Sequence, residues 1–309
     1  FKLIQNGLLF LVVAEEVKDK KHAKRVILAL LCGAVLVSLD ALWQLHSGKD
    51  FIRGYGPDIH LGDLARATAS FPTCNVLGVY LVPTVAVAFG LALYYLKGTL
   101  RILAIFAGAL ILGGVYLTFS RFAGLAALIS LLTLAIWKRN KVILGLLFVF
   151  LVMSPFLLPR NIKDWAKGIH YNPVIFAFNA DRISIYRNTL NMISHHPIIG
   201  VGLNTFSLNY AKYRLPEPEG ATSGIVYAHN NFLHMAGEIG VLGLSIFILF
   251  LILLFKTCIR IYRRVQDPFI KTLAGCLTIS LGAYLINGIS ETSLYYARVV
   301  ILFWFIIGF

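Results

Sequence analysis

Stretches of apolar residues separated by short polar connections run along almost the whole chain. Nine of them indicate membrane helices, since a helix needs ~20 apolar residues to cross a bilayer. Continuous apolar runs favour helices over a barrel, because a helix satisfies its backbone hydrogen bonds internally. We therefore predict an all-α fold, a polytopic transmembrane helical bundle. The predicted segments are residues 3–14, 26–45, 75–96, 102–119, 122–137, 142–158, 232–255, 272–289 and 299–309.

The composition supports an integral membrane protein. Hydrophobic residues make up 58% of the chain and charged residues only 14%, whereas a soluble domain of this size would need more polar surface. We expect residues 1–309 to form a single transmembrane domain that is a fragment, because both ends fall in apolar segments. No signal-peptide pattern precedes the first apolar run. The four cysteines show no paired spacing, so we interpret them as small apolar fillers.

Basic residues divide the connections between the spans into two sets. One set is dense in lysine and arginine, which predicts a cytoplasmic position; it comprises residues 17–25, 97–101, 138–141 and 256–271. The other set then faces the periplasm; it comprises residues 46–74, 120–121, 159–227 and 290–298. The net charge of +14 suggests anionic partners. Arginine prevails over lysine on the outer side, and its forked guanidinium suits phosphate oxygens, although interface anchoring is the alternative for any single arginine.

The periplasmic loop of residues 159–227 is predicted to be partly helical. Its stretch "NADRISIYRNTLNMISHHP" reads as an amphipathic helix with Asp181 as N-cap and Pro197 as its stop. Arg182 and Tyr186 share one face of this helix by their i, i+4 spacing. The following segment "YRLPEPEGATSG" is rich in Pro, Gly and Glu and predicts a mobile loop that admits a bulky substrate.

A group of polar residues lies where the seventh apolar stretch begins, within "VYAHNNFLHMAGEIGVLG". If a helix starts there, Asn231, His234 and Glu238 fall on one side of it, since seven residues make almost two turns. His229 then lies at the N-terminal mouth of the helix, where free backbone N–H groups and the helix dipole favour an anion. Helix capping by Asn230 beside an interfacial histidine is the alternative interpretation.

Three further arginines lie at the outer ends of predicted spans. Arg121, in "YLTFSRFAGLAAL", separates two apolar runs with almost no loop, and a charge held at or inside the membrane is costly and usually functional. A simple helix-turn anchor is the alternative for this residue. Arg66 precedes one span and Arg298 opens the last, where it equally suits an interface anchor. Asp40 lies within a span and is a possible ion-pair partner for one of these arginines.

Three segments together resemble the bacterial O-antigen ligase and O-antigen polymerase family. "TFSRFAGLAAL" is similar to the span-turn-span arginine of that family, and "DRISIYRNTLNMISHHPIIGVGLNTF" to its outer-loop arginine helix followed by a Pro-Gly turn. "YAHNNFLHMAGEIGVLG" is similar to its His-Asn motif at the start of a late span. Their order, spacing and common outer side carry the likeness over residues 116–255, and "ETSLYYARVVILFWF" extends it towards the end of the chain.

The resemblance implies a multi-pass glycosyltransferase of the bacterial plasma membrane with a periplasmic active site. The donor would be a glycan on undecaprenyl diphosphate, and the acceptor a lipid A–core sugar in a ligase or another lipid-linked repeat in a polymerase. It implies no nucleic acid partner. Arg121, Arg182 and His229 match the positions expected to act. Arg66 and Arg298 are looser matches, also assigned to diphosphate binding.

The same residues suit this chemistry on physical grounds. A diphosphate leaving group needs its charge neutralised, and Arg121 and Arg182 stay protonated at any working pH. The acceptor hydroxyl has a high pKa, so we predict that His229 takes its proton as a general base and that direct displacement inverts the anomeric centre. Asn230, Asn231 and Glu238 would orient His229 or contact sugar hydroxyls.

Three functions stay open at this point: ligation of a glycan to lipid A–core, polymerisation of lipid-linked repeats, and transport of a polyprenyl-diphosphate lipid without chemistry. Clustering of the polar groups at one face of the membrane favours an enzyme over a carrier, which would place charges near the midplane. The sequence holds no P-loop, G-x-G-x-x-G, H-E-x-x-H or D-x-D pattern. We therefore expect neither a nucleotide substrate nor a cofactor or metal.

Overall fold

The structure is a computed structural model that describes residues 2–60, 64–157, 160–216 and 227–309. It is predominantly helical, which confirms the predicted all-α polytopic fold. Within the described residues, five helices are long and apolar enough to cross a membrane. These are α2 (Lys20–Ser47), α3 (Cys74–Tyr94), α4 (Gly98–Leu117), α11 (Asn231–Arg264) and α12 (Pro268–Asn287).

The remaining predicted spans also coincide with helices. They are α1 (Lys2–Glu16), α5 (Arg121–Trp137), α6 (Lys141–Leu157) and α13 (Ala297–Gly308). One feature of the connections was not predicted. Two short antiparallel strands, β1 (Asp58–His60) and β2 (Leu64–Arg66), pair in the connection that follows α2, with Asp58 opposite Arg66.

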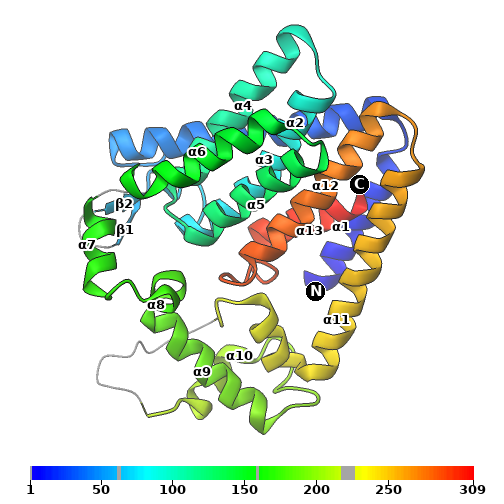
Figure 1. The fold of residues 1–309 in the computed structure, drawn as a ribbon. Coiled ribbons are helices and arrows are strands. Elements are labelled where there is room, and N and C mark those ends of the chain that lie inside the picture. Colours follow the sequence, from blue (N-terminus) through cyan, green and yellow to red (C-terminus); the bar gives the residue numbers. More distant parts are fainter. Residues whose placement is uncertain (1, 61–63, 158–159, 217–226) are drawn as a thin grey trace. The chain divides into compact units, whose positions relative to one another are not determined.

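The chain forms two compact units, coloured along the sequence in Figure 1. Unit 1 comprises Phe1–Trp165, Thr257–Asn287 and Ala297–Phe309. Unit 2 comprises Ala166–Lys256 and Gly288–Tyr296. Unit 2 therefore holds most of the segment predicted as the periplasmic loop, together with the first part of α11 and the connection between α12 and α13.

Helix α3 is the core of unit 1. It is apolar around its whole circumference, and most of its residues are buried, which is typical of a helix surrounded by others. Its neighbours are α2, α4, α5, α12 and α13. Small residues let these helices approach closely: Gly78 of α3 faces Ala123 of α5, and Gly90 of α3 faces Cys276 of α12.

Unit 2 has its own small apolar core beside the start of α11. Its helices are α8 (Pro173–Phe178), α9 (Ala180–His195), α10 (Phe206–Tyr210) and the short 3-10 helix η1 (Ala211–Tyr213), with α7 (Arg160–Gly168) leading into it from unit 1. The cluster is formed by Ile185, Met192, Phe206, Tyr210 and Ala228. It fixes α9 and α10 against the turn that precedes α11.

Helix α11 is broken at Gly240, whose φ of 69° and ψ of −176° are not helical. In a continuous helix the N–H groups of Val241 and Leu242 would donate to the carbonyls four residues earlier. Instead they donate to Pro197 O (2.8 Å) and Ile198 O (3.3 Å). The carbonyls thereby freed accept hydrogen bonds from the same loop: Val201 N donates to Gly237 O (3.0 Å) and Gly202 N to Glu238 O (2.9 Å). The loop after α9 thus inserts into the break and satisfies all four groups.

Candidate functional site

The turn that enters α11 places His229 at the beginning of the helix. His229 adopts a left-handed backbone conformation with φ of 49°, and Asn230 caps the helix by accepting hydrogen bonds from Phe232 N (2.9 Å) and Leu233 N (3.0 Å). Asn231 is fully buried and ties the connection after α12 to the helix through bonds to Ser293 and Leu294. The two asparagines therefore fix the backbone that directly follows the histidine.

A buried carboxylate joins His229 to Arg182. Nδ1 of His229 lies 3.1 Å from Oε1 of Glu291, and Nη2 of Arg182 lies 3.5 Å from Oε2. Thr292 N donates to Oε1 at 3.4 Å. The side chain of Glu291 is 3% exposed, against 34% for His229. The imidazole thus has a buried acidic side and a side open to solvent.

The charge of Glu291 decides the tautomer of His229. Burial acts to raise the pKa of Glu291, but the hydrogen bond from His229, the charges of His229 and Arg182 and the Thr292 N–H hold it below its usual value of 4.5. The group is therefore an ionised acceptor at neutral pH, and the Nδ1–H of His229 donates to it. In the neutral ring Nε2 then carries the lone pair, and no described residue forms a hydrogen bond with Nε2.

Helix α9 supplies Arg182 and Tyr186 on one face, as the i, i+4 spacing predicts. Nη1 of Arg182 donates to Ser290 O, and the Tyr186 hydroxyl donates to His229 O (3.0 Å) and Ile289 O (3.2 Å). Burial raises the pKa of Tyr186 to about 12, so it stays a donor. The predicted N-cap at Asp181 is wrong, because Asn179 leaves the helical conformation and Asp181 already lies in the first turn. The helix ends at His195, just before Pro197, as predicted.

Glu238 contacts a second histidine and not His229. Glu238 Oε1 lies 3.5 Å from Nε2 of His234 and accepts a hydrogen bond from Phe206 N (3.1 Å). The other ring nitrogen of His234 accepts a hydrogen bond from Ala228 N (3.2 Å), and its ring stacks on Phe206 with centroids 4.4 Å apart. This buried pair fixes the residue immediately before His229 and the start of α10.

In unit 1, Arg66 and Arg121 lie at one turn. Arg121 is the first residue of α5, directly after a turn in which Phe119 has φ of 45°. Arg66 donates to the carbonyls of this turn, from Nε to Thr118 O (2.9 Å) and from Nη2 to Phe119 O (3.4 Å). The end of β2 is thereby fastened to the backbone that presents Arg121.

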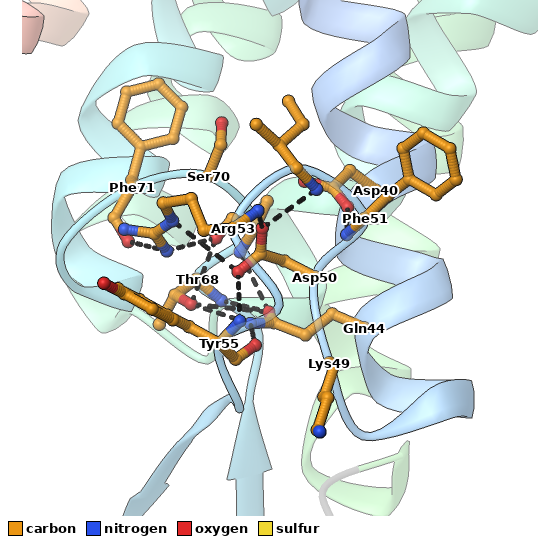
Figure 2. A network of polar contacts seen from close by, with 12 residues as sticks. Asp40, Gln44, Lys49, Asp50, Phe51, Arg53, Tyr55, Thr68, Ser70 and Phe71 are labelled. Atoms are coloured by element: carbon orange, nitrogen blue, oxygen red, sulfur yellow. Dashed lines mark hydrogen bonds and ion pairs between the residues drawn. The ribbon is translucent and has the colours of Figure 1, made fainter.

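A buried polar network shapes the connection that carries Arg66 (Figure 2). Gln44 of α2 is fully buried; its Oε1 accepts hydrogen bonds from Thr68 N (2.8 Å) and Ala69 N (2.9 Å), while its Nε2 donates to Tyr55 O (3.0 Å). Arg53 donates to the Ala69 carbonyl (2.6 Å). All donors and acceptors of the Gln44 amide are used within this connection, so its path is set by the end of α2.

Two further contacts in unit 1 involve residues that the sequence singled out. Asp40 accepts a hydrogen bond from Phe51 N (2.7 Å), and none of the ion pairs among the described residues joins Asp40 to an arginine. Arg298, the second residue of α13, donates to Ser70 O (2.7 Å) from an exposed position. Unit 1 therefore holds Arg66, Arg121 and Arg298, whereas unit 2 joins Arg182 and His229 through Glu291.

Comparison with known proteins assigns the region that holds most of these residues. Residues 105–248 match the family model described as O-antigen ligase. The chain carries an O-antigen ligase domain. The predicted resemblance to this family is thus confirmed over residues 105–248, while no curated protein matches the chain significantly. Arg121, Arg182 and His229 all lie inside the O-antigen ligase domain, and Arg66, Glu291 and Arg298 lie outside it.

Glu291 is the residue of the site that sequence reasoning missed. It is the acidic residue of residues 290–298, the connection predicted to face outward, in which the sequence singled out only Arg298 as a candidate site residue. The sequence did hold one signal for Glu291: it is a carboxylate close to the end of a predicted span, on the same predicted side of the membrane as His229. Of the segment predicted to be a mobile loop over the O-antigen ligase domain, residues 217–224 lie outside the described residues.

Proposed function

We propose that the chain transfers a glycan from undecaprenyl diphosphate to a hydroxyl of lipid A–core, on the periplasmic side of the bacterial plasma membrane. One observation carries the proposal. Within unit 2, a buried carboxylate holds Nδ1 of a partly exposed histidine whose Nε2 has no hydrogen-bond partner among the described residues, and an arginine lies beside the same carboxylate. This is the geometry of an oriented general base next to a fixed positive charge. The O-antigen ligase domain supports the same class of reaction.

In this mechanism His229 is the general base. The acceptor oxygen attacks the anomeric carbon and loses its proton to Nε2, while the bond from that carbon to the diphosphate oxygen breaks and its electron pair leaves with the diphosphate. One displacement inverts the anomeric centre. Glu291 acts as a positioning residue, because it holds the Nδ1–H and stabilises the imidazolium that forms. Asn230, Asn231 and the His234–Glu238 pair fix the backbone that carries His229.

The diphosphate requires positive charge that cannot be lost by deprotonation. Nη1 of Arg182 donates to the Ser290 carbonyl, and Nη2 pairs with the Glu291 carboxylate. The remaining N–H groups of Arg182 can still donate to phosphate oxygens. Arg121 is the first residue of α5, and the dipole of a helix favours an anion at its N-terminus. Arg66 shapes the turn before Arg121, and Arg298 is the weaker candidate for direct contact. We assign Arg121 and Arg182 to binding of the leaving diphosphate on the chemistry of their side chains.

The direct test is a transfer assay with the purified chain in lipid. It is supplied with an undecaprenyl-diphosphate glycan and lipid A–core, and the product is followed by gel. We expect a glycan–lipid A–core product that forms equally in EDTA, since no metal enters the mechanism. A ladder of products from lipid-linked repeats without lipid A–core would show a polymerase instead. Movement of the lipid across vesicles without any transfer would show a carrier and contradict the proposal.

Replacement of Glu291 by glutamine should lower kcat by about 10–100-fold, because an amide accepts the Nδ1–H more weakly and leaves Arg182 without its charge partner. Asp181→Asn is the matched control, an exposed acid beside Arg182 whose loss should not change kcat. A lower rate in Glu291→Gln that is accompanied by a lower melting temperature would reduce Glu291 to a purely structural residue.

Replacement of Arg121 by lysine should lower kcat/KM for the lipid-linked donor on the order of 10–100-fold. A lysine keeps the charge but cannot donate in the forked geometry that diphosphate oxygens accept. Arg187→Lys, at an exposed position on α9, should leave the rate unchanged. Equal kcat/KM in the Arg121→Lys and wild-type proteins would remove Arg121 from the diphosphate site.

A further inference from the structure

The loop that inserts into the break of α11 exposes large apolar side chains. Ile198 is 66% exposed, Ile199 72% and Leu203 55%. The whole segment of residues 197–203, "PIIGVGL", contains no polar or charged side chain. A loop surrounded by water would not ordinarily present such a continuous apolar surface.

This surface continues onto a face of α11 that belongs to the membrane span. Leu242, whose N–H donates to Ile198 O, is 56% exposed. Ile246, Leu249 and Leu253 follow it on the same face by i+4, i+7 and i+11 spacing, and each is more than half exposed. Because α11 is long and apolar enough to cross a membrane, an unpacked apolar stripe along it faces hydrocarbon.

The loop also meets the condition for backbone in hydrocarbon, where unpaired N–H and C=O groups are costly. The carbonyls of Pro197 and Ile198 and the N–H groups of Val201 and Gly202 pair with α11. Gly200 N donates to His196 O (3.1 Å), and the Thr205 hydroxyl donates to Val201 O (3.0 Å). Polar residues reappear only at the two ends of the segment, where His196 bonds to Tyr213.

We propose that residues 197–203 lie in the bilayer, against lipid acyl chains at the end of the span where α11 begins. The occupant of this surface is lipid hydrocarbon because the surface is continuous with the lipid-facing stripe of α11. The loop would then fix the depth of the half-helix before Gly240, to which Gly202 and Val201 are bonded. The membrane itself thereby sets the level of the turn that carries His229.

Spin-label accessibility tests this placement in proteoliposomes. Nitroxides are attached to Ile198→Cys and Ile199→Cys in a chain whose Cys32 and Cys258 are alanine, since Cys74 and Cys276 are buried. Both replaced isoleucines are exposed, so the labels displace no core packing. Leu249→Cys on α11 is the hydrocarbon reference, and Lys212→Cys on η1 is the aqueous reference.

We expect labels at residues 198 and 199 to collide often with oxygen and rarely with a water-soluble nickel chelate, as at residue 249. Frequent collision with the chelate, as at residue 212, would place the loop in water and overturn the proposal. Rare collision with both reagents would also overturn it, because the surface would then be covered by protein, such as a second copy of this chain. None of these outcomes depends on whether the chain transfers glycan.

Discussion

Replacement of His229 by alanine should lower glycan transfer by about 10³–10⁴-fold, the largest effect expected of any single substitution on activity. The variant removes the Nε2 that takes the acceptor proton, and it leaves Glu291 without the ring that its carboxylate orients. The acceptor must then lose its proton to water. Single-turnover transfer from the undecaprenyl-diphosphate glycan to lipid A–core measures the change in the chemical step directly.

The control separates a chemical role from a structural one. His195→Ala removes an exposed histidine at the end of α9, whose Nδ1 contacts Asn191 O at 2.9 Å. That variant should retain wild-type turnover and melting temperature. The His229→Ala protein should melt close to the wild type as well, since its ring is partly exposed and its cap is formed by Asn230. Normal turnover in His229→Ala would show that the base is assigned wrongly.

The spans were predictable because lipid imposes a simple rule on sequence. A segment that crosses hydrocarbon must be helical and apolar over its length, so α2, α3 and α12 are visible from composition alone. The β1–β2 hairpin was not predictable in this way. Its strands are three residues each, and the residue after β2 is held by a tertiary bond from Ala67 N to Leu117 O (3.0 Å), far along the chain.

The site was predictable only in part, for a related reason. Arg182 and His229 belong to local patterns, a helix face and a helix start, which spacing reveals. Glu291 lies 62 residues after His229 in sequence, and only the folding of the connection after α12 onto α11 brings them together. For Glu238 the local pattern was misleading. Its i, i+4 spacing correctly placed it on the same side of the helix as His234, but its carboxylate contacts His234 and not His229.

The break in α11 explains why one predicted span is not a simple helix. "GEIGVLG" reads as part of a continuous apolar segment with glycines, which transmembrane helices tolerate. A break there is costly unless other groups satisfy the freed backbone. The "PIIGVG" loop supplies those groups from about 40 residues earlier in the chain. The two motifs are therefore one structural unit, and neither predicts the break without the other.

Replacement of Gly240 by alanine should destabilise unit 2 by more than ~3 kcal/mol, the largest loss of stability expected in the chain. A Cβ at this position would lie 2.1 Å from Ile198 O and 2.3 Å from Ile198 C, which are backbone atoms that no rotamer change can move. Its φ of 69° with ψ of −176° is a region open almost only to glycine. We expect a lower melting temperature in detergent and faster proteolysis of the loop after α9.

The matched control is Gly282→Ala in α12, where a Cβ would meet no atom within 4 Å and alanine favours the helix by about 1 kcal/mol over glycine. That variant should melt at or above the wild-type temperature. If Gly240→Ala melted at the same temperature as Gly282→Ala, the loop would have to separate from the helix break without loss of stability. The four backbone bonds between them argue against this, because separation would leave four N–H groups and four carbonyls without these partners.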